Sequence, residues 1–411
     1  MSKILINCLV YRPDTVSAAN IFTDVAEWLA NSGHEVTVIT SVPHYSLPEG
    51  GQEKWEGRRG DRKLITISNE NGVRILRVYM RRKGRHVLSR VLDYLWFHLA
   101  SILLGVFAVG KCDVVFVPSP PITLGITGHA FKFIKQARLV YDVRELWPSV
   151  PIRLGLISNR LVVRFTYAIE KFVYKSSDTI LAISRSFIRN IIEGGVPADK
   201  LVYIPVFIDT EFLKPKKKHN EFALEYNLTN KFVVFYAGNA GHTQELEILV
   251  EVAEKLSDIK ELCVLIIGDG ASWQALEKKV VASTEKNIMM LPFQNWERIC
   301  NTYATADVCV SPMKAGFNYD TVPSKIYSAL AAGCPVVVAA EKDTEAAMLV
   351  RESNSGIIVP PEDASAMAMA IRQLHSDPEK LADMGNLGRE WVEKNNSREL
   401  VLKQYDRILS A

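Results

Sequence analysis

The chain has 411 residues, 48% of them hydrophobic and 23% charged, which is enough apolar content for two sizeable buried cores. The net charge is only +3, but residues 1–205 carry 27 Lys and Arg against 17 Asp and Glu, whereas the rest of the chain carries 22 against 29. The six cysteines contain no C-x-x-C pair, which argues against a disulfide framework or a zinc site and indicates a reduced, cytosolic protein. An apolar strand pattern follows Met1 directly, so no secretory signal is expected.

Strand and helix patterns alternate through the first half of the chain. Strands are expected at 3–10, 33–40, 113–118, 137–142, 179–183 and 201–204, with helices over 18–31, 122–136 and 160–175. Two more strands are expected within 64–79, around a turn at 69–72. Such alternation predicts a doubly wound parallel sheet. His34 lies at the first turn from helix to strand, where we expect a structural role.

A basic cluster precedes a long apolar run in this half. The cluster consists of Arg81, Arg82, Lys83, Arg85 and Arg90, and the nearly uncharged run spans 95–110. The run is shorter than the ~20 residues needed to cross a bilayer, so a buried helix is expected, and a role at a membrane surface stays open. Aromatic residues are not interleaved with the cluster, so an anionic membrane surface is a better partner than nucleic acid.

The same alternation restarts after a linker at 205–220. Strands are expected from 232 and at 262–267, 288–291, 308–311, 336–339 and 356–359. We therefore predict an α/β fold with two Rossmann-like domains, 1–205 and 206–385, and a C-terminal helix at 386–411 that returns toward the first domain. Ligands bind at the carboxyl ends of parallel strands, so both domains are expected to face a common cleft.

Residues 232–250 carry a glycine turn between a strand and a helix. Large apolar residues lead into Gly238 and Gly241, and apolar residues then recur at helical spacing. A helix that starts over Gly238 to Gln244 would offer free amides to a phosphate or diphosphate, although such a turn can also simply pack a helix on a strand. Lys-Ser or Lys-Thr does not follow, and a third glycine is missing, which argues against a P-loop and a full dinucleotide fingerprint.

Several motifs, in order along nearly the whole chain, resemble glycosyltransferases of the GT-B fold. The motifs are Gly33-His-Glu-Val-Thr-Val-Ile39, Ile204-Pro-Val-Phe-Ile-Asp209, Gly238-Asn-Ala-Gly241, Ile267-Gly-Asp-Gly270, Tyr303-Ala-Thr-Ala-Asp307, Val322-Pro-Ser-Lys325 through Val337, and Gly356-Ile-Ile-Val-Pro-Pro361. They are most similar to the retaining family 4 enzymes of bacterial surface-polysaccharide assembly, of O-antigen or capsule. Tyr141-Asp-Val-Arg-Glu-Leu-Trp-Pro148 and Pro43-His-Tyr-Ser-Leu-Pro48 resemble the subgroup that includes N-acetyl-L-fucosamine transferases.

The resemblance implies transfer of a sugar, such as an N-acetylated deoxysugar, from a nucleotide diphosphate donor, which we expect to be UDP-linked. The diphosphate is expected at Gly238 to Gln244, and the wider family places an Arg and a Lys there, where this sequence has Asn239 and Gln244. That departure gives more weight to backbone amides and to Lys325 as sources of positive charge. No Asp-x-Asp motif occurs, so catalysis without a metal or other cofactor is expected.

The resemblance also implies the remaining contacts of the donor. The family's pair of glutamates, spaced E-x7-E, corresponds to Asp320 and Ser328, of which Asp320 retains a carboxylate for the donor sugar and Ser328 leaves only a weaker ribose contact. Ordinary helix surface is the alternative for both residues. The backbone near Phe293 and Gln294 is expected to read the base, and Thr321 and Val322 are expected to approach the sugar.

The acceptor is expected on the N-terminal domain. Asp142, Arg144 and Glu145 follow a strand, and Arg144 stands where many relatives have a histidine. We expect Asp142 and Arg144 to serve catalysis together with Asp320, and His44, Arg144 and Glu145 to bind a lipid-linked saccharide. An ion-paired structural cluster is the alternative. The expected location is the cytoplasmic face of a membrane, peripherally bound.

Three other functions stay open. A nucleotide-sugar epimerase of the same fold would bind the same donor. A catalytically inactive accessory subunit would explain Ser328 and the missing Arg and Lys. A dinucleotide-binding oxidoreductase would use Asp269 as its acidic residue, but the incomplete glycine pattern disfavours it.

Overall fold

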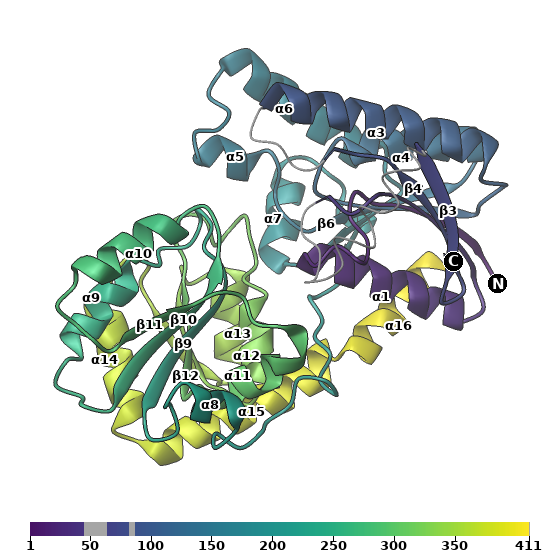
Figure 1. The fold of residues 1–411 in the computed structure, drawn as a ribbon. Helices are drawn as coiled ribbons and strands as arrows, with labels where there is room; N and C mark the ends of the chain where they lie inside the picture. Colours follow the sequence, from purple (N-terminus) through teal and green to yellow (C-terminus); the bar gives the residue numbers. More distant parts are fainter. Residues whose placement is uncertain (45–63, 82–86, 411) are drawn as a thin grey trace. The chain divides into compact units, whose positions relative to one another are not determined.

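The computed structural model describes residues 1–44, 64–81 and 87–410, which form two compact units (Figure 1). The N-terminal unit comprises Met1–Ile183, Phe187–Ile204 and Leu402–Ala411. The C-terminal unit comprises Ser184–Ser186 and Pro205–Val401. Each unit has its own sheet, flanked by helices, and almost all strand pairs are parallel. The predicted fold class, two doubly wound α/β units, is confirmed.

The described part of the N-terminal unit contains an eight-stranded sheet in the order β3-β4-β2-β1-β5-β6-β7-β8. Its strands are β1 (Lys3–Asn7), β2 (Glu35–Ser41), β3 (Ile65–Glu70), β4 (Val73–Val78), β5 (Val114–Pro118), β6 (Arg138–Val143), β7 (Thr179–Ala182) and β8 (Leu201–Tyr203). Only β3, at the edge, runs antiparallel to its neighbour. The central strands are buried along almost their whole length, as expected for continuous apolar runs covered on both faces.

Helices cover both faces of this sheet. They are α1 (Ser17–Asn31), α3 (Val87–Phe107), α4 (Leu124–Lys135), α5 (Ser149–Arg153), α6 (Arg160–Ser176), α7 (Arg185–Glu193), the short 3-10 helix η2 (Ala198–Lys200), and α16 (Arg398–Leu409). Figure 1 shows α3, α4 and α6 over one face, with α1 and α16 over the other. The expected burial of the apolar run in α3 is wrong in part, because only 28% of its apolar window is buried.

The chain's last helices differ from the single C-terminal helix expected at 386–411. That segment holds the end of α15 (Pro378–Asn396) and all of α16. The helix breaks because the backbone around Ser397 pairs with Ile208: the Ile208 amide donates to Asn396 and the Arg398 amide donates to Ile208. From Leu402 onward the chain belongs to the N-terminal unit.

His34 joins α16 to the start of the chain. Its Nδ1 accepts a hydrogen bond from the Ser2 amide at 3.0 Å, and its Nε2 lies 3.0 Å from Asp406 Oδ1 in α16. His34 therefore has the structural role expected from its place at the turn.

The described residues of the C-terminal unit form a parallel sheet of six strands in the order β11-β10-β9-β12-β13-β14. Its strands are β9 (Phe232–Asn239), β10 (Leu262–Asp269), β11 (Ile288–Leu291), β12 (Val308–Pro312), β13 (Val336–Ala339) and β14 (Gly356–Val359). The other helices of this unit are α8 (Glu221–Glu225), α9 (Ile248–Lys255), α10 (Trp273–Ala282), the 3-10 helix η3 (Trp296–Arg298), α11 (Ile299–Thr305), α12 (Lys325–Ala331), α13 (Glu345–Ser353) and α14 (Ala364–His375).

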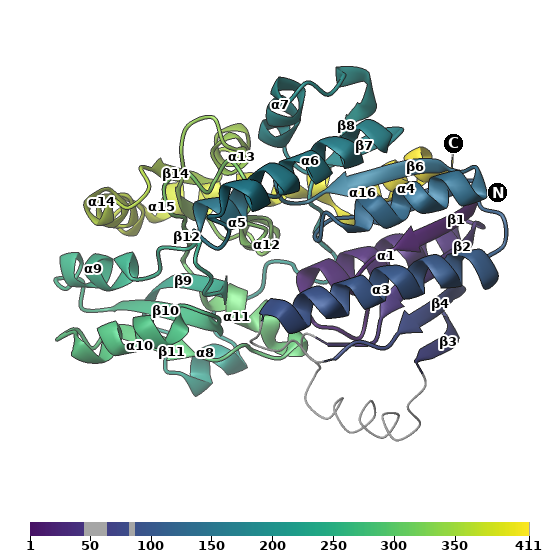
Figure 2. The ribbon, with the colours of Figure 1, turned by 90° about the horizontal axis from the view of Figure 1, so that it is seen from above.

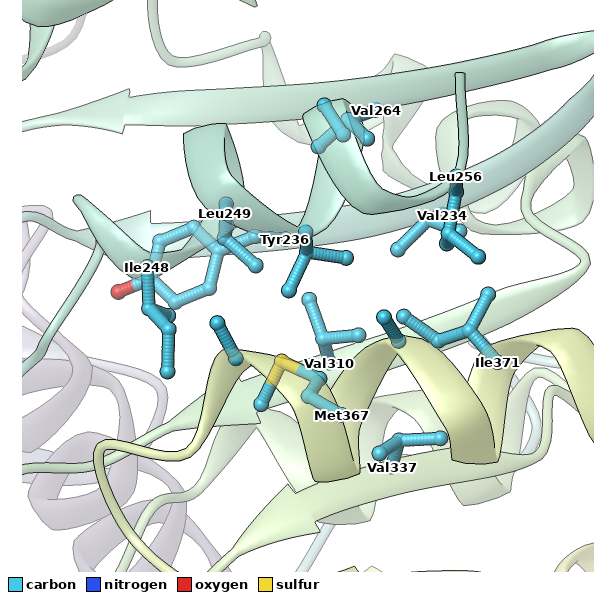
Figure 3. Close-up of a cluster of buried hydrophobic side chains, with 14 of the residues drawn as sticks. Val234, Tyr236, Ile248, Leu249, Leu256, Val264, Val310, Val337, Met367 and Ile371 are labelled. Atoms are coloured by element: carbon cyan, nitrogen blue, oxygen red, sulfur yellow. The ribbon is translucent and has the colours of Figure 1, made fainter. Parts of the chain in front are cut away.

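The strand order places the start of the unit at the centre of its sheet. The chain passes outward from β9 through β10 to β11, then crosses back to β12 and continues outward to β14. Ligands of open parallel sheets bind at such a switch point, here the carboxyl ends of β9 and β12. A large buried cluster fixes these strands: Figure 3 shows Leu249 of α9 and Met367 and Ile371 of α14 packed against Val234, Val310 and their neighbours.

The helix after β9 begins later than expected. Strand β9 continues through Gly238 to Asn239, and α9 starts only at Ile248. The intervening backbone bonds to the loop after β12 instead of forming a helical turn, since the Glu245 amide donates to Pro312 and the Lys314 amide donates to Thr243. The expected helix N-terminus over Gly238 to Gln244 is therefore wrong.

Candidate functional site

The carboxyl ends of β9 and β10 approach each other through glycines. Gly238 has a backbone φ of +142° and Gly270 has a φ of +148°, values that residues other than glycine rarely adopt. A Cβ atom at Gly268 would lie 2.1 Å from the Gly238 carbonyl oxygen, and one at Gly270 would lie 2.5 Å from Asn239 Oδ1. Only glycine lets the ends of β9 and β10 come this close.

Lys325, the first residue of α12, reaches this turn. Its Nζ donates to Tyr236 Oη at 2.7 Å and to Gln244 Oε1 at 3.0 Å, and it lies 4.0 Å from the centroid of the Tyr236 ring. A Cβ atom at Gly238 would lie 3.3 Å from Lys325 Cε. The lysine side chain therefore lies against Gly238, and it is not an ordinary solvated side chain.

The surroundings of Lys325 set its charge. The residue keeps some exposed surface, but its ammonium group is enclosed, and this burial lowers its pKa from 10.5 to about 7. Tyr236 Oη in turn donates to the Asn239 carbonyl at 2.8 Å, which ties the lysine to the glycine turn. An anion bound at the turn would favour the charged ammonium, because an opposite charge within a few ångströms raises the pKa of a lysine.

The two residues that correspond to the glutamate pair have different surroundings. Asp320 is buried in the loop before α12, so the helix-surface alternative does not describe it. Ser328 lies half-buried on α12 near Tyr303, where its hydroxyl opposes the rise that burial causes in the pKa of Tyr303. The Tyr303 ring packs edge-on against Phe235, with 5.2 Å between the ring centroids. Ser328 therefore lies on the side of α12 that faces Tyr303.

The loop that contains Asp320 is anchored on Glu341. Glu341 Oε1 accepts from the Gly316 amide at 2.5 Å, and its Oε2 accepts from Asn318 Nδ2 at 2.9 Å. Thr321 Oγ1 donates to the Phe317 carbonyl at 3.0 Å, which closes a turn directly before Val322. These hydrogen bonds therefore fix the position of the loop segment Asp320 to Val322, just before Lys325.

A hollow of about 400 Å³ opens beside the glycine turn, between the ends of β10 and β11. It is lined by Gly268, Asp269, Trp273, Glu277, Met290, Leu291, Pro292 and Phe293. Phe293 was expected there, whereas Gln294 donates its side-chain amide to the Pro292 carbonyl at 2.9 Å. Trp273 was missed, although it lies four residues after β10, and β10 pairs with β11, whose following loop was expected to read the base.

The residues expected to bind the acceptor lie in the N-terminal unit, at the carboxyl edge of its sheet. Asp142 is fully buried, and its Oδ2 accepts from Arg144 Nη1 at 3.3 Å and from Tyr405 Oη at 3.3 Å. Burial raises the pKa of Asp142, and Arg144 opposes that rise. The ion-paired structural alternative thus describes Asp142, which positions Arg144. Burial also raises the pKa of Glu145.

His44 lies on the same edge but at another strand. It follows β2, which is separated from β6 by β1 and β5. Its Nδ1 is 2.8 Å from Ser41 Oγ and 3.9 Å from Asp14 Oδ2, and the ring is buried. The remainder of the motif that begins at Pro43, and residues 82–85 of the basic cluster, lie outside the described residues. The structure therefore brings Asp142 and Arg144 together but places His44 apart.

Comparison with protein families identifies the class. A model described as "Glycosyl transferase 4-like domain" matches residues 18–206, and one described as "Glycosyl transferases group 1" matches residues 218–391. The chain is therefore a glycosyltransferase of the GT-B fold, with a family 4-like domain followed by a group 1 domain.

Individual relatives extend over most of the chain. It is 27% identical, across 98% of both chains, to the putative colanic acid biosynthesis glycosyl transferase WcaI of Escherichia coli. It is 22% identical to the probable glycosyltransferase WbjE of Pseudomonas aeruginosa, over 71% of this chain and 73% of that one.

Solved structures show the same fold. Anabaena HepE in complex with UDP-glucose superposes with a TM-score of 0.72 at 15% identity and covers both chains completely. WaaG, a glycosyltransferase involved in lipopolysaccharide biosynthesis, superposes with a TM-score of 0.68 at 14% identity, over 99% of this chain and all of the other.

Proposed function

We propose that this glycosyltransferase transfers a sugar from a UDP-linked donor, with retention, to a lipid-linked saccharide in the biosynthesis of a bacterial surface polysaccharide, at the cytoplasmic face of a membrane. The name of WcaI, a putative colanic acid biosynthesis glycosyl transferase, supports polysaccharide assembly. The observation that carries the proposal is the Lys325 ammonium against Gly238, beside a hollow large enough for a nucleobase. An N-acetylated deoxysugar remains our proposal for the group transferred.

The geometry suits a leaving diphosphate. The bond between the anomeric carbon and the donor oxygen breaks with both electrons left on the oxygen. The departing nucleoside diphosphate, which already carried two negative charges, thereby gains a third. Lys325 is positioned to neutralise this charge at the glycine turn, in a partly dehydrated site where one charge is worth more than in water. We propose that no metal is required, because Lys325, whose charged form a bound diphosphate favours, takes the place of a metal cation at the turn.

The acceptor hydroxyl loses its proton as its oxygen bonds to the anomeric carbon. With retention, the acceptor approaches on the side from which the diphosphate leaves, so a diphosphate oxygen is well placed to take this proton. Asp320 is proposed to hold a hydroxyl of the donor sugar, and Arg144 to bind a phosphate of the lipid-linked acceptor. Asp142 keeps the Arg144 guanidinium in place.

The base is the least determined part of the donor. Anabaena HepE is described in complexes with UDP and UDP-glucose, whereas other relatives are named GDP-mannose-dependent mannosyltransferases. A thermal-shift panel of UDP-, GDP- and dTDP-sugars decides between them, since a ligand that binds only the folded state raises Tm. A shift with GDP-sugars alone would contradict the UDP assignment.

Turnover separates this function from its rivals. Transfer of labelled sugar from the donor to an organic-extractable lipid fraction is the expected result. Ser328, in place of the second glutamate of the pair, favours one rival, an inactive accessory subunit, which would bind the donor without turnover. An epimerase would convert the donor with no acceptor present.

A further inference from the structure

Helix α3 exposes a continuous apolar stripe. Leu92, Leu95, Leu99, Leu103 and Val106 follow one another at spacings of three or four residues, and each is 39–59% exposed. By length and composition the helix could cross a membrane. A helix that is apolar all round is normally covered on every side, so the outer face of α3 lacks a cover in the isolated chain.

The contacts of the inner face of α3 show that the helix packs against the rest of the N-terminal unit. His98 Nε2 is 2.8 Å from Thr123 Oγ1, and His98 Nδ1 is 2.9 Å from Thr127 Oγ1, at the start of α4. A Cβ atom at Gly105 would lie 2.1 Å from the ring of Phe131, so the two helices pack closely. Crossing a bilayer would break these contacts, and a position in the plane of a surface keeps them.

The apolar surface continues over two neighbouring helices. Helix α4 lies between α3 and α6, as Gly125 packs on Val173 and His129 stacks edge-on against Phe172 at 5.0 Å (Figure 2). Exposed apolar side chains on these two helices are Ile126, Phe133, Ile134, Leu161, Val162, Phe165 and Phe172. We call the surface formed by α3, α4 and α6 the three-helix face. Monomeric proteins rarely expose so extended an apolar surface without an interaction.

Charge identifies what covers the three-helix face. The three helices carry seven Lys and Arg against two acidic residues, and one of the two, Asp93, is paired with Arg81 at 2.8 Å. On α6 the exposed residues Arg160, Arg164 and Lys171 alternate with the apolar ones. This surplus of positive charge beside exposed Leu and Phe side chains complements anionic lipid, which attracts each basic residue near its surface by about 1 kcal/mol.

We propose that the three-helix face docks on an anionic membrane leaflet, with its apolar side chains at the boundary between headgroups and acyl chains and its basic residues at the level of the phosphates. This assigns the contact to α3, α4 and α6, beyond the basic cluster at 81–90. This proposal rests on the proposed function, for which it names the anionic membrane as partner. Lipid binding can be measured without any sugar transfer. Attachment there would hold the N-terminal unit beside a lipid-linked acceptor.

Sedimentation of the full chain with vesicles tests the proposal. Binding is expected to vesicles of phosphatidylcholine with about 30 mol% phosphatidylglycerol, and to weaken with salt and without the anionic lipid. The triple variant Leu95→Gln, Leu99→Gln, Leu103→Gln is expected to weaken binding by at least about tenfold. Arg160→Gln, Arg164→Gln, Lys171→Gln together should weaken it by about 100-fold and remove the dependence on anionic lipid.

The matched control is Leu224→Gln, Val281→Gln, Met369→Gln, three comparably exposed apolar residues of the C-terminal unit, and it should bind as the wild type does. Every variant should keep its Tm and its circular dichroism. A wild type that stays in the supernatant with anionic vesicles at low salt overturns the proposal, as do two triple variants that bind normally. A concentration-dependent dimer that the leucine triple dissociates, with no vesicle binding, makes the face a protein interface instead.

Failure of this proposal is distinguishable from failure of the proposed function. If the protein binds vesicles but neither binds nor transfers from a UDP-sugar, the membrane contact is retained and the proposed UDP-dependent transfer is rejected. Transfer to a soluble acceptor analogue without vesicle binding would do the reverse.

Discussion

At the scale of single residues, Lys325 brings an ammonium group to the glycine turn. Asn239 and Gln244 stand where the wider family is expected to have cationic residues, and Gln244 accepts a hydrogen bond from Lys325. The sequence alone suggested this substitution of one cation for another. It could not show Tyr236 as the second partner, because that contact joins residues 89 positions apart.

Removal of the Lys325 charge is expected to slow transfer. Lys325→Ala should lower kcat by about 10- to 1000-fold, the usual effect of one lost electrostatic stabiliser of a leaving group. Initial rates with saturating UDP-sugar measure it, and Lys278→Ala, an exposed lysine of the same unit, is the control. Unchanged kcat in a folded Lys325→Ala protein would contradict the role given to this residue.

The lowered pKa of Lys325 predicts a pH dependence of donor binding. The free enzyme carries the charged ammonium below pH about 7 and loses it above. Bound diphosphate favours the charged form, so the pKa rises in the complex and the affinity for UDP-glucose should fall as pH rises above about 7, by up to about tenfold per unit.

Calorimetry with UDP-glucose from pH 6 to 9, about one unit apart, measures this slope. Lys325→Met should bind more weakly and show no such slope over the same range. A wild-type affinity that is constant, or that increases with pH, would rule out protonated Lys325 as the binding form.

At the scale of elements, the alternating pattern was sufficient to predict most strands and helices, because central strands of a parallel sheet are long apolar runs. Three features depended on tertiary contacts instead. The loop after β12 delays α9, the bridge between Ile208 and Ser397 splits the last helix, and the outer face of α3 stays uncovered. Trp273 was missed for a related reason, since only the pairing of β10 with β11 brings it beside Phe293.

Arg389 fixes helix α15 on the C-terminal unit by hydrogen bonds. Its guanidinium donates to the carbonyls of Thr210, Leu213 and Ala331, at 2.9, 2.9 and 2.6 Å. Arg389→Ala leaves these acceptors without their charged donor, and should destabilise the unit by about 2–3 kcal/mol. Urea denaturation of residues 205–401 measures this, with the exposed Lys394→Ala as control. A loss no larger than that of the control would mean that water replaces the guanidinium.

At the scale of the whole molecule, the two units divide the proposed chemistry. The half before residue 206 is basic and carries the residues expected to meet the acceptor, whereas the acidic remainder holds the glycine turn, Lys325 and the hollow. All described residues of the candidate donor site come from the C-terminal unit. The sequence predicted this division because the motifs of the donor site all follow residue 232.

The last prediction is that residues 205–401 bind UDP without the rest of the chain. The boundary at 385 expected from the sequence cuts α15 before Arg389, and α15 packs against α12, α13 and α14. The fragment 205–401 should therefore fold and bind UDP with nearly the affinity of the full chain, whereas 205–385 should lose stability and binding together. Calorimetry and circular dichroism of both fragments measure this. A folded 205–401 fragment with no heat of binding, while the full chain binds UDP, would show that the nucleotide needs residues of the N-terminal unit.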